Sequence, residues 1–191
     1  MTDMKTESDN SENDGRNKAL VLRREVLELA GPKGFRILDI GAGPLAIIAA
    51  KEYGCIVTSV DIDRDKIETW REEAEKEGVS GRITFKEEDV TALSFPDDEF
   101  DMSLCFGSLH HIAPGEREKA VSEISRVSRG RIVISDFTTE GLPEIHPGGE
   151  FEPVDHGHLK EILESKGSLV IIHLEKMMVY IVEKGKGPEG K

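Results

Sequence analysis

The sequence is poor in cysteine and has no long hydrophobic run. Its two cysteines, Cys55 and Cys105, stand far apart and form no CxxC pair. This spacing argues against a disulfide framework or a zinc knuckle and fits a reducing compartment. No segment approaches the roughly 18 consecutive apolar residues of a membrane span, and residues 1–15 lack the basic start and apolar middle of a signal peptide. We therefore expect a cytoplasmic protein with no membrane partner.

Basic residues are also scarce. The chain carries 25 lysines and arginines against 38 acidic residues, which gives a formal net charge of −13. Proteins that bind long stretches of nucleic acid normally present a basic face, because contacts to phosphates dominate that affinity. No basic patch stands out in this sequence, so we expect no nucleic-acid partner.

The composition is typical of a single globular domain, with 37% hydrophobic and 33% charged residues in a chain of 191. Residues 1–15 and 185–191 are predicted to be disordered tails around one domain at 16–184. Within this domain, short β-branched runs alternate with longer amphipathic segments, which favours a parallel α/β architecture. The predicted strands are 36–40, 56–60, 83–86, 100–106 and 131–135, and the predicted helices are 17–30, 45–53, 64–77, 114–128 and 155–166.

Two further apolar runs, at 168–175 and 176–184, stand near the end of the sequence. They are separated by too little chain for a helical crossover, so we expect an antiparallel pair. The sequence thus predicts a Rossmann-like, doubly wound sheet of seven strands in the α/β class. The sheet should be mostly parallel, with an antiparallel C-terminal hairpin strand and helices on both faces.

A turn containing two glycines follows the first predicted strand, in the sequence ILDIGAGP at 37–44. Gly41 and Gly43 allow a tight strand-to-helix turn and let the backbone approach a ligand closely. The amides at the start of the next helix favour an anionic group. Asp61 follows the second predicted strand, where a carboxylate can accept hydrogen bonds from both hydroxyls of a ribose. Together these features predict a nucleoside cofactor.

Two classes of cofactor are compatible with this turn. Gly41, Gly43 and Ala46 match the dinucleotide spacing GxGxxG/A, so an NAD(P)-dependent oxidoreductase is one alternative. Asp39 argues against it, because a negative charge there suits the ammonium of a methionine moiety better than a pyrophosphate. The predicted antiparallel hairpin also departs from the usual dinucleotide-binding sheet. A P-loop is excluded, since GxxxxGK[ST] occurs nowhere in the sequence.

Residues 36–112 resemble the core of class I S-adenosylmethionine-dependent methyltransferases of the small-molecule type. The resemblance lies in ILDIGAGP, in TSVDIDRDKIETWREEAEKEG, and in ITFKEEDVTALSFPDDEFDMSLCFGSLHHI. It implies S-adenosylmethionine as the cofactor and a small molecule as the methyl acceptor. The cofactor-binding residues that it implies are Asp39, Gly41 and Gly43 at the methionine end, Asp61 at the ribose, Ile62, Asp89 and Val90 around the adenine, and Phe106 and Gly107 beside the sulfonium.

The sequence departs from this family at one position of the turn. A third glycine that is common there is replaced by Pro44 and Leu45. Proline has no N–H to donate, so the turn is shaped at this point by rigidity rather than by an amide contact. This difference bears on the affinity for the cofactor.

Histidines are the candidates for catalysis. His110 and His111 follow the fourth predicted strand, where the acceptor should bind, and a neutral imidazole can accept a proton near pH 7. Packing or capping is the alternative role for both. The segment HPGGEFEPVDHGH at 146–158 is expected to shape the acceptor pocket. No metal is expected, although His146, His156 and His158 are the candidate ligands if one binds.

The sequence therefore predicts an enzyme that transfers a methyl group from S-adenosylmethionine to a small-molecule acceptor. A non-catalytic relative that binds the cofactor is a further alternative beside the oxidoreductase. A lid over the acceptor would come from the first helix, from the loop at 137–157 or from a second subunit. A homodimer is therefore one of the alternatives.

Overall fold

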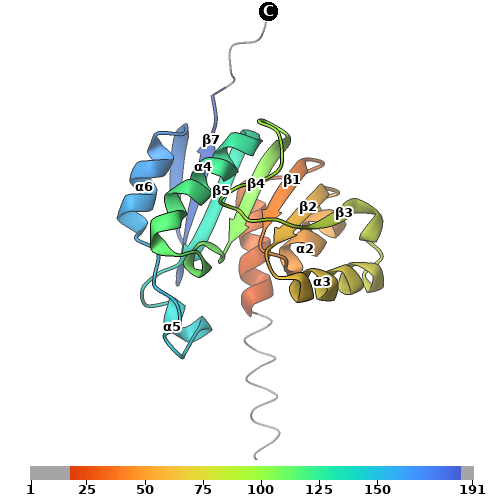
Figure 1. Cartoon of the computed structure of the whole chain (residues 1–191), viewed down its shortest axis with the longest axis horizontal. Helices are drawn as coiled ribbons and strands as arrows, with labels where there is room; N and C mark the ends of the chain where they lie inside the picture. Colours follow the sequence, from red (N-terminus) through yellow and green to blue (C-terminus); the bar gives the residue numbers. More distant parts are fainter. Residues whose placement is uncertain (1–17, 186–191) are drawn as a thin grey trace, which may run out of the picture.

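The computed structural model describes residues 18–185 (Figure 1). In these residues one seven-stranded sheet has the strand order β3-β2-β1-β4-β5-β7-β6. The strands are β1 (Arg36–Ile40), β2 (Ile56–Asp61), β3 (Ile83–Glu87), β4 (Phe100–Phe106), β5 (Ser128–Phe137), β6 (Ser168–His173) and β7 (Met177–Glu183). Strands β1 to β5 run parallel, as predicted. Of the predicted tails, 1–15 and 186–191 lie outside the described residues.

The antiparallel part of the sheet is the hairpin of β6 and β7. Strand β7 is antiparallel to both of its neighbours and places Ile181 opposite Val133 of β5 and Val170 of β6. Residues 174–176 connect the two strands, and the amide of Leu174 donates to the carbonyl of Met177 at 2.9 Å. Because a connection this short permits only an antiparallel pair, the predicted hairpin is confirmed.

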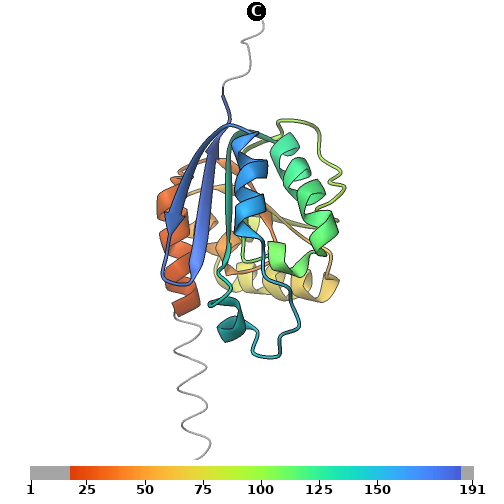
Figure 2. The ribbon, with the colours of Figure 1, turned by 90° about the vertical axis from the view of Figure 1, so that its left-hand side faces the viewer.

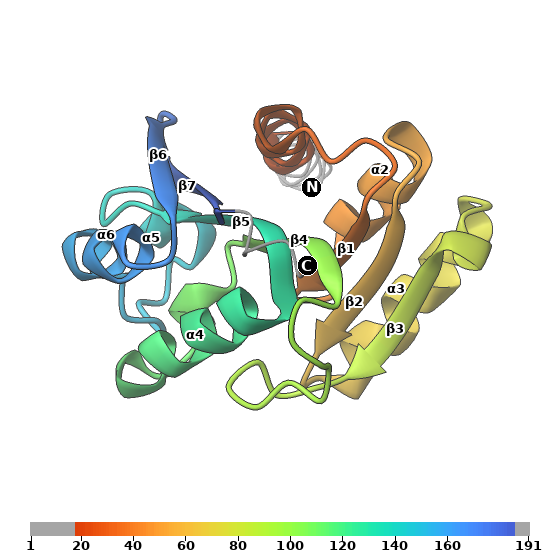
Figure 3. The same cartoon turned by 90° about the horizontal axis from the view of Figure 1, so that it is seen from above.

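Helices cover both faces of the sheet (Figure 3). On one face, the helix at 18–30, α2 (Pro44–Glu52) and α3 (Arg64–Lys76) pack on a first hydrophobic core. On the other face, α4 (Arg117–Val127) and α6 (His156–Glu164) pack on a second. The central strands β1, β4 and β5 are largely buried on both sides, as a sheet with two covered faces requires, whereas the edge strands β3 and β6 expose alternate residues. No helix within residues 18–185 is long and apolar enough to cross a membrane.

Strand β5 is longer than predicted at both ends. It begins directly after α4, where the hydroxyl of Ser128 donates to the carbonyl of Ile124 at 2.6 Å. The ammonium of Lys184 also donates to the carbonyls of Ser125 and Ser128. At the other end, β7 continues to pair with β5 as far as Phe137. The length of β5 is therefore set by residues that follow it by some fifty positions, which the local pattern does not show.

A short helix that was not predicted, α5 (Leu142–Ile145), follows β5. Its Leu142 is buried, and Gly141 lies so close to the carbonyl of Lys176 that a Cβ there would overlap it. Figure 2 shows α5 and the loop after it at one end of the sheet, and Figure 1 shows the same placement. This is the end at which the parallel strands finish, where open α/β sheets bind their ligands.

Replacing Val133 by alanine should lower the free energy of unfolding by about 2 kcal/mol, because this residue of β5 is 1% exposed and its truncation leaves a cavity. The same change at Val170, which is 52% exposed on the edge strand β6, should cost less than about 0.5 kcal/mol. Urea unfolding followed by circular dichroism measures both values. Equal losses at the two positions would contradict the placement of β5 inside the sheet and β6 at its edge.

Candidate active site

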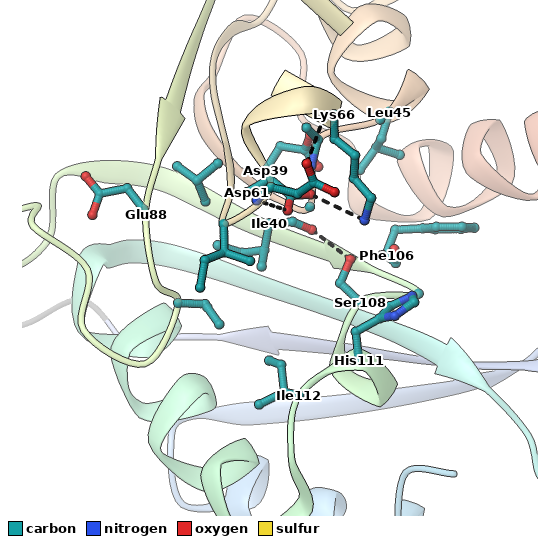
Figure 4. Close-up of a pocket in the computed structure, with 18 of the residues that line it drawn as sticks. Asp39, Ile40, Leu45, Asp61, Lys66, Glu88, Phe106, Ser108, His111 and Ile112 are labelled. Atoms are coloured by element: carbon teal, nitrogen blue, oxygen red, sulfur yellow. Dashed lines mark hydrogen bonds and ion pairs between the residues drawn. The ribbon is translucent and has the colours of Figure 1, made fainter. Parts of the chain in front are cut away.

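A cavity of about 510 Å³ opens at the carboxyl ends of the parallel strands (Figure 4). Ligands bind at this edge in open parallel sheets, because the strand ends and the loops after them converge there. The lining includes all nine residues predicted to bind a cofactor, namely Asp39, Gly41, Gly43, Asp61, Ile62, Asp89, Val90, Phe106 and Gly107. They come from the ends of β1, β2, β3 and β4, so the fold brings together residues that are far apart in the sequence.

The two glycines of the turn after β1 differ in what the fold demands of them. Gly41 has a φ of +95°, and a Cβ there would overlap the hydroxyl of Ser108, which donates to the carbonyl of Ile40 at 3.0 Å. Gly43 is extended, with a φ of −172°, and a Cβ there would meet only the carbonyl of Gly41 at 3.8 Å. Protein contacts therefore require glycine at position 41 but not at position 43.

Asp61 ends β2 and holds this turn in place. Its Oδ2 accepts a hydrogen bond from the amide of Ala42 at 3.0 Å, and its Oδ1 accepts one from the amide of Asp63 at 3.0 Å. The ammonium of Lys66 lies 3.9 Å from Oδ2. A carboxylate offers about four lone pairs, so Asp61 can still accept hydrogen bonds from a ligand in the cavity.

Asp39 is the buried carboxyl group of the site. Burial raises its pKa to about 7, and the nearby Asp61 adds to this effect. A hydrogen bond from the hydroxyl of Ser59, at 2.8 Å, and the positive charge of Arg23 lower the pKa but do not cancel the rise. A carboxyl group with a pKa near neutrality ionises readily when a cation approaches, so the charge of Asp39 can respond to a ligand.

Arg23 reaches the cavity from the helix at 18–30 and was not among the predicted site residues. Its guanidinium carbon lies 4.5 Å from the centre of the Phe106 ring, which is a cation–π contact. Its Nη1 donates to the carbonyl of Ala19 at 2.9 Å. Little in the sequence singles out this arginine, since a charged residue on an amphipathic helix usually faces solvent. Its position adds a cation to a site lined by carboxylates.

The outer rim of the cavity combines an apolar surface with an oriented carboxylate. Ile62 is 70% exposed although it is large and apolar. The Oδ1 of Asp89 accepts hydrogen bonds from the amide and the hydroxyl of Thr91, both at 2.8 Å, and these bonds lower the pKa of Asp89. Val90 lies beside them on the cavity wall. This combination suits a flat heteroaromatic ring that carries an amino group.

Three of the predicted histidines meet beside the cavity. His111 lines it, whereas His110 is buried, with its Nδ1 2.7 Å from Oδ1 of Asp136. His146, at the end of α5, places its Nε2 3.1 Å from Nε2 of His110. The ring of Phe151 packs against all three imidazoles, with distances between ring centres of 4.3 to 5.6 Å. We refer to His110, His111 and His146 as the histidine cluster.

The other two candidate metal ligands are not part of this cluster. The ring nitrogens of His156 lie 2.9 Å from the carbonyl of Phe137 and 3.1 Å from the hydroxyl of Tyr180, so both are engaged in packing α6 on the sheet. His158 is exposed, with its Nδ1 3.8 Å from a carboxylate oxygen of Glu161. The structure thus joins His146 to the histidines after β4 rather than to its neighbours in the sequence, because the chain folds back between α5 and α6.

His111 presents a neutral imidazole to the cavity. Partial desolvation of its ring, and to a smaller extent the neighbouring His110 and His146, together lower its pKa to about 4. The imidazole is therefore neutral at pH 7, with one ring nitrogen available as an acceptor. Figure 4 shows its side chain at the cavity wall near Ser108.

This strand order, with a glycine turn after β1 and carboxylates after β2 and β3, defines a methyltransferase fold of class I. Residues 37–130 match the family described as "Methyltransferase domain". Residues 37–130 therefore carry a methyltransferase domain, within a chain that has the class I methyltransferase fold.

The chain is similar to methyltransferases of several kinds. It is 31% identical over 160 residues to 27-O-demethylrifamycin SV methyltransferase from Amycolatopsis mediterranei, covering 82% of this chain and 55% of the relative. It is 36% identical over 110 residues to demethylmenaquinone methyltransferase from Bacteroides fragilis, covering 54% and 44%. Magnesium protoporphyrin IX methyltransferase from Synechocystis, solved with bound SAH, has a TM-score of 0.69 at 18% identity, covering 90% and 84%. The chain spans about half the length of the curated relatives it matches.

Replacing Gly41 by alanine should destabilise the fold by about 1–3 kcal/mol, because the residue has a positive φ and its Cβ would overlap Ser108. Replacing Gly43 by alanine should change stability by less than about 0.5 kcal/mol, since its backbone is extended and the space is open. Thermal and urea unfolding of the two variants test this contrast. A loss at Gly43 as large as that at Gly41 would be incompatible with it.

The raised pKa of Asp39 predicts that stability falls as the pH rises. The folded protein keeps this proton up to about pH 7, whereas the unfolded chain releases it near the ordinary value of 3.8. Between these limits the folded state binds more protons, so raising the pH favours unfolding. Asp39→Asn should flatten this fall, while Asp65→Asn on the exposed first turn of α3 should not. Urea unfolding at stepped pH measures the slopes, which must differ between the two variants.

Proposed function

We propose that the protein is an S-adenosylmethionine-dependent methyltransferase that acts on a small-molecule acceptor. The observation that carries this proposal is the convergence of nine predicted residues on one cavity at the ligand-binding edge of the sheet. A volume of about 510 Å³ lies within the range of small-molecule and cofactor sites. The match of residues 37–130 to the methyltransferase domain family supports the same activity.

The nucleoside part of the cofactor fits the ends of β2 and β3. Asp61 would accept hydrogen bonds from both ribose hydroxyls, because the amides that it already binds fix its orientation toward the cavity. Ile62 and Val90 would pack on the adenine, which would cover the exposed side chain of Ile62. Asp89 would accept a hydrogen bond from the amino group of the adenine.

The methionine part of the cofactor fits the end of β1. Its ammonium would lie beside Asp39, because the approach of a cation favours the ionised form of this buried carboxyl group. Its carboxylate would lie beside the guanidinium of Arg23. Gly41 and Gly43 leave the backbone open on this side, and Phe106 and Gly107 would border the sulfonium. The ammonium and the carboxylate of the methionine moiety thus each meet an opposite charge.

Methyl transfer is a displacement at carbon in which the sulfonium supplies a good leaving group. The chain's own residues therefore need to align the acceptor with the methyl group, exclude water and, for a protonated acceptor, remove a proton. His111 is the candidate base, because its neutral imidazole faces the cavity. His110 faces Asp136 instead, so it would act by positioning its neighbours.

A small molecule is the acceptor class that the chain favours. The two curated relatives described above carry the names of small acceptors, a demethylrifamycin and a demethylmenaquinone. The formal charge of −13 disfavours a polyanionic acceptor such as nucleic acid. The loop after α5, with Phe151 against the histidine cluster, would form the wall on the acceptor side.

Asp61→Ala should weaken the binding of S-adenosylhomocysteine by about 1–3 kcal/mol, since it removes the acceptor for the ribose hydroxyls. Glu87→Ala is the matched control. Glu87 stands opposite Asp61 in the register of β2 and β3, but it binds Arg64 and does not line the cavity. Isothermal titration calorimetry should therefore give the wild-type affinity for the Glu87 variant. A wild-type affinity for the Asp61 variant would remove the assignment of the ribose site.

The same titrations with NADH separate the two cofactor classes, because binding of NADH alone would overturn the methyltransferase proposal. Turnover is then measured with thiols, phenols, amines and metalloid compounds as acceptors. Methyl transfer to one of them supports the proposal. Tight binding of S-adenosylhomocysteine without any turnover would favour a non-catalytic protein that binds the cofactor.

A further inference from the structure

The histidine cluster has ring nitrogens close enough to share one ion. The Nε2 atoms of His110 and His146 are 3.1 Å apart, and one nitrogen from each of the three histidines lies within 4.8 Å of the others. Nitrogen ligands about 2.0–2.1 Å from a tetrahedral Zn²⁺ are about 3.3 Å from one another. The pair His110–His146 already has this spacing. The third nitrogen, from the exposed His111, lies within 4.8 Å of the other two and would have to move inward to reach the same spacing.

The buried carboxylate of Asp136 orients His110 within the histidine cluster. Oδ1 of Asp136 lies 2.7 Å from Nδ1 of His110, and the amide of Phe137 donates to the same oxygen at 2.8 Å. Oδ2 of Asp136 accepts from the amide of His110 at 3.2 Å. Because the carboxylate accepts the Nδ1 proton, the lone pair of His110 is on Nε2, which faces His146. Metal-binding histidines are typically held by a second-shell carboxylate in this way.

We propose that His110, His111 and His146 form a binding site for a divalent transition-metal ion such as Zn²⁺, with Asp136 as the residue that positions His110. Three imidazoles suit Zn²⁺ and its neighbours in the first transition series. Three protein ligands leave one coordination position open, which is the arrangement of reactive rather than purely structural zinc sites. Phe151 shields one side of the cluster from solvent.

An acceptor bound to the ion would lie beside the cofactor cavity, because His111 belongs both to the cluster and to the cavity wall. This consequence rests on the proposed function. The acceptors that such a site takes are thiols and acidic hydroxyls, which lose a proton to solvent on coordination, so that His111 serves as a ligand and coordination replaces its role as the base. The sulfur or oxygen then bonds to the methyl carbon, the bond from carbon to the sulfonium breaks, and its electron pair stays on the sulfur of S-adenosylhomocysteine.

The test is titration of the untagged, metal-stripped full chain with Zn²⁺ by calorimetry and with Co²⁺ by visible absorption. Wild-type protein should bind one ion per chain and give the spectrum of tetrahedral Co²⁺. His146→Ala and His111→Ala should each weaken binding at least about tenfold, and Asp136→Asn about 10–100-fold. His158→Ala and His173→Ala, which remove exposed histidines outside the cluster, should bind the ion as the wild type does. Circular dichroism confirms that each variant is folded.

The result is independent of the cofactor assignment. His146 does not line the cofactor cavity, so His146→Ala should bind S-adenosylhomocysteine with wild-type affinity even though it loses the metal. Failure of the wild-type chain to bind one ion, or equal weakening by the His146 and His158 variants, would overturn the metal site and leave the methyltransferase proposal intact. Metal binding without binding of S-adenosylhomocysteine would support the metal site and overturn the methyltransferase proposal.

Discussion

The hydrogen bond from the amide of Ala42 to Asp61 is the constraint on which the site depends. It joins the turn after β1 to the end of β2, and the bond from the amide of Gly41 to the carbonyl of Val60 makes the same link one residue earlier. The bond from Gly41 continues the backbone ladder one residue past the end of β1, and the bond from Ala42 adds a contact to the side chain of Asp61. The turn and the carboxylate therefore share the rigidity of the sheet, and the cavity needs little ordering when a ligand enters.

The parts of the site that the sequence predicts lie at the ends of strands or directly after them. Asp39, Gly41 and Asp61 can be located because apolar β-branched runs mark the strands, and parallel strands finish at one edge. The antiparallel hairpin can be predicted equally well, since the short connection between its two strands allows only an antiparallel pair. In each case the information is local, within one run of residues or the turn beside it.

The remaining features depend on contacts between segments that are distant in the sequence, and local sequence patterns do not predict such contacts. His110 and Asp136 are 26 positions apart, and His110 and His146 are 36 apart. Asp136 lies in an apolar strand with nothing in the pattern to indicate its partner. Arg23 is one of several charged residues on its helix, and only its place beside Phe106 distinguishes it. Periodicity assigns a residue to a face, whereas these roles require knowing which faces meet.

The position of β7 has a consequence for the way the protein is made. This strand is the last of the seven in the sequence, yet it lies between β5 and β6. While the chain is being synthesised, β5 has one edge without a partner until β7 leaves the ribosome. An open apolar edge is a template for pairing with other chains. The edge of β5 therefore stays open to pairing with other chains until β7 emerges.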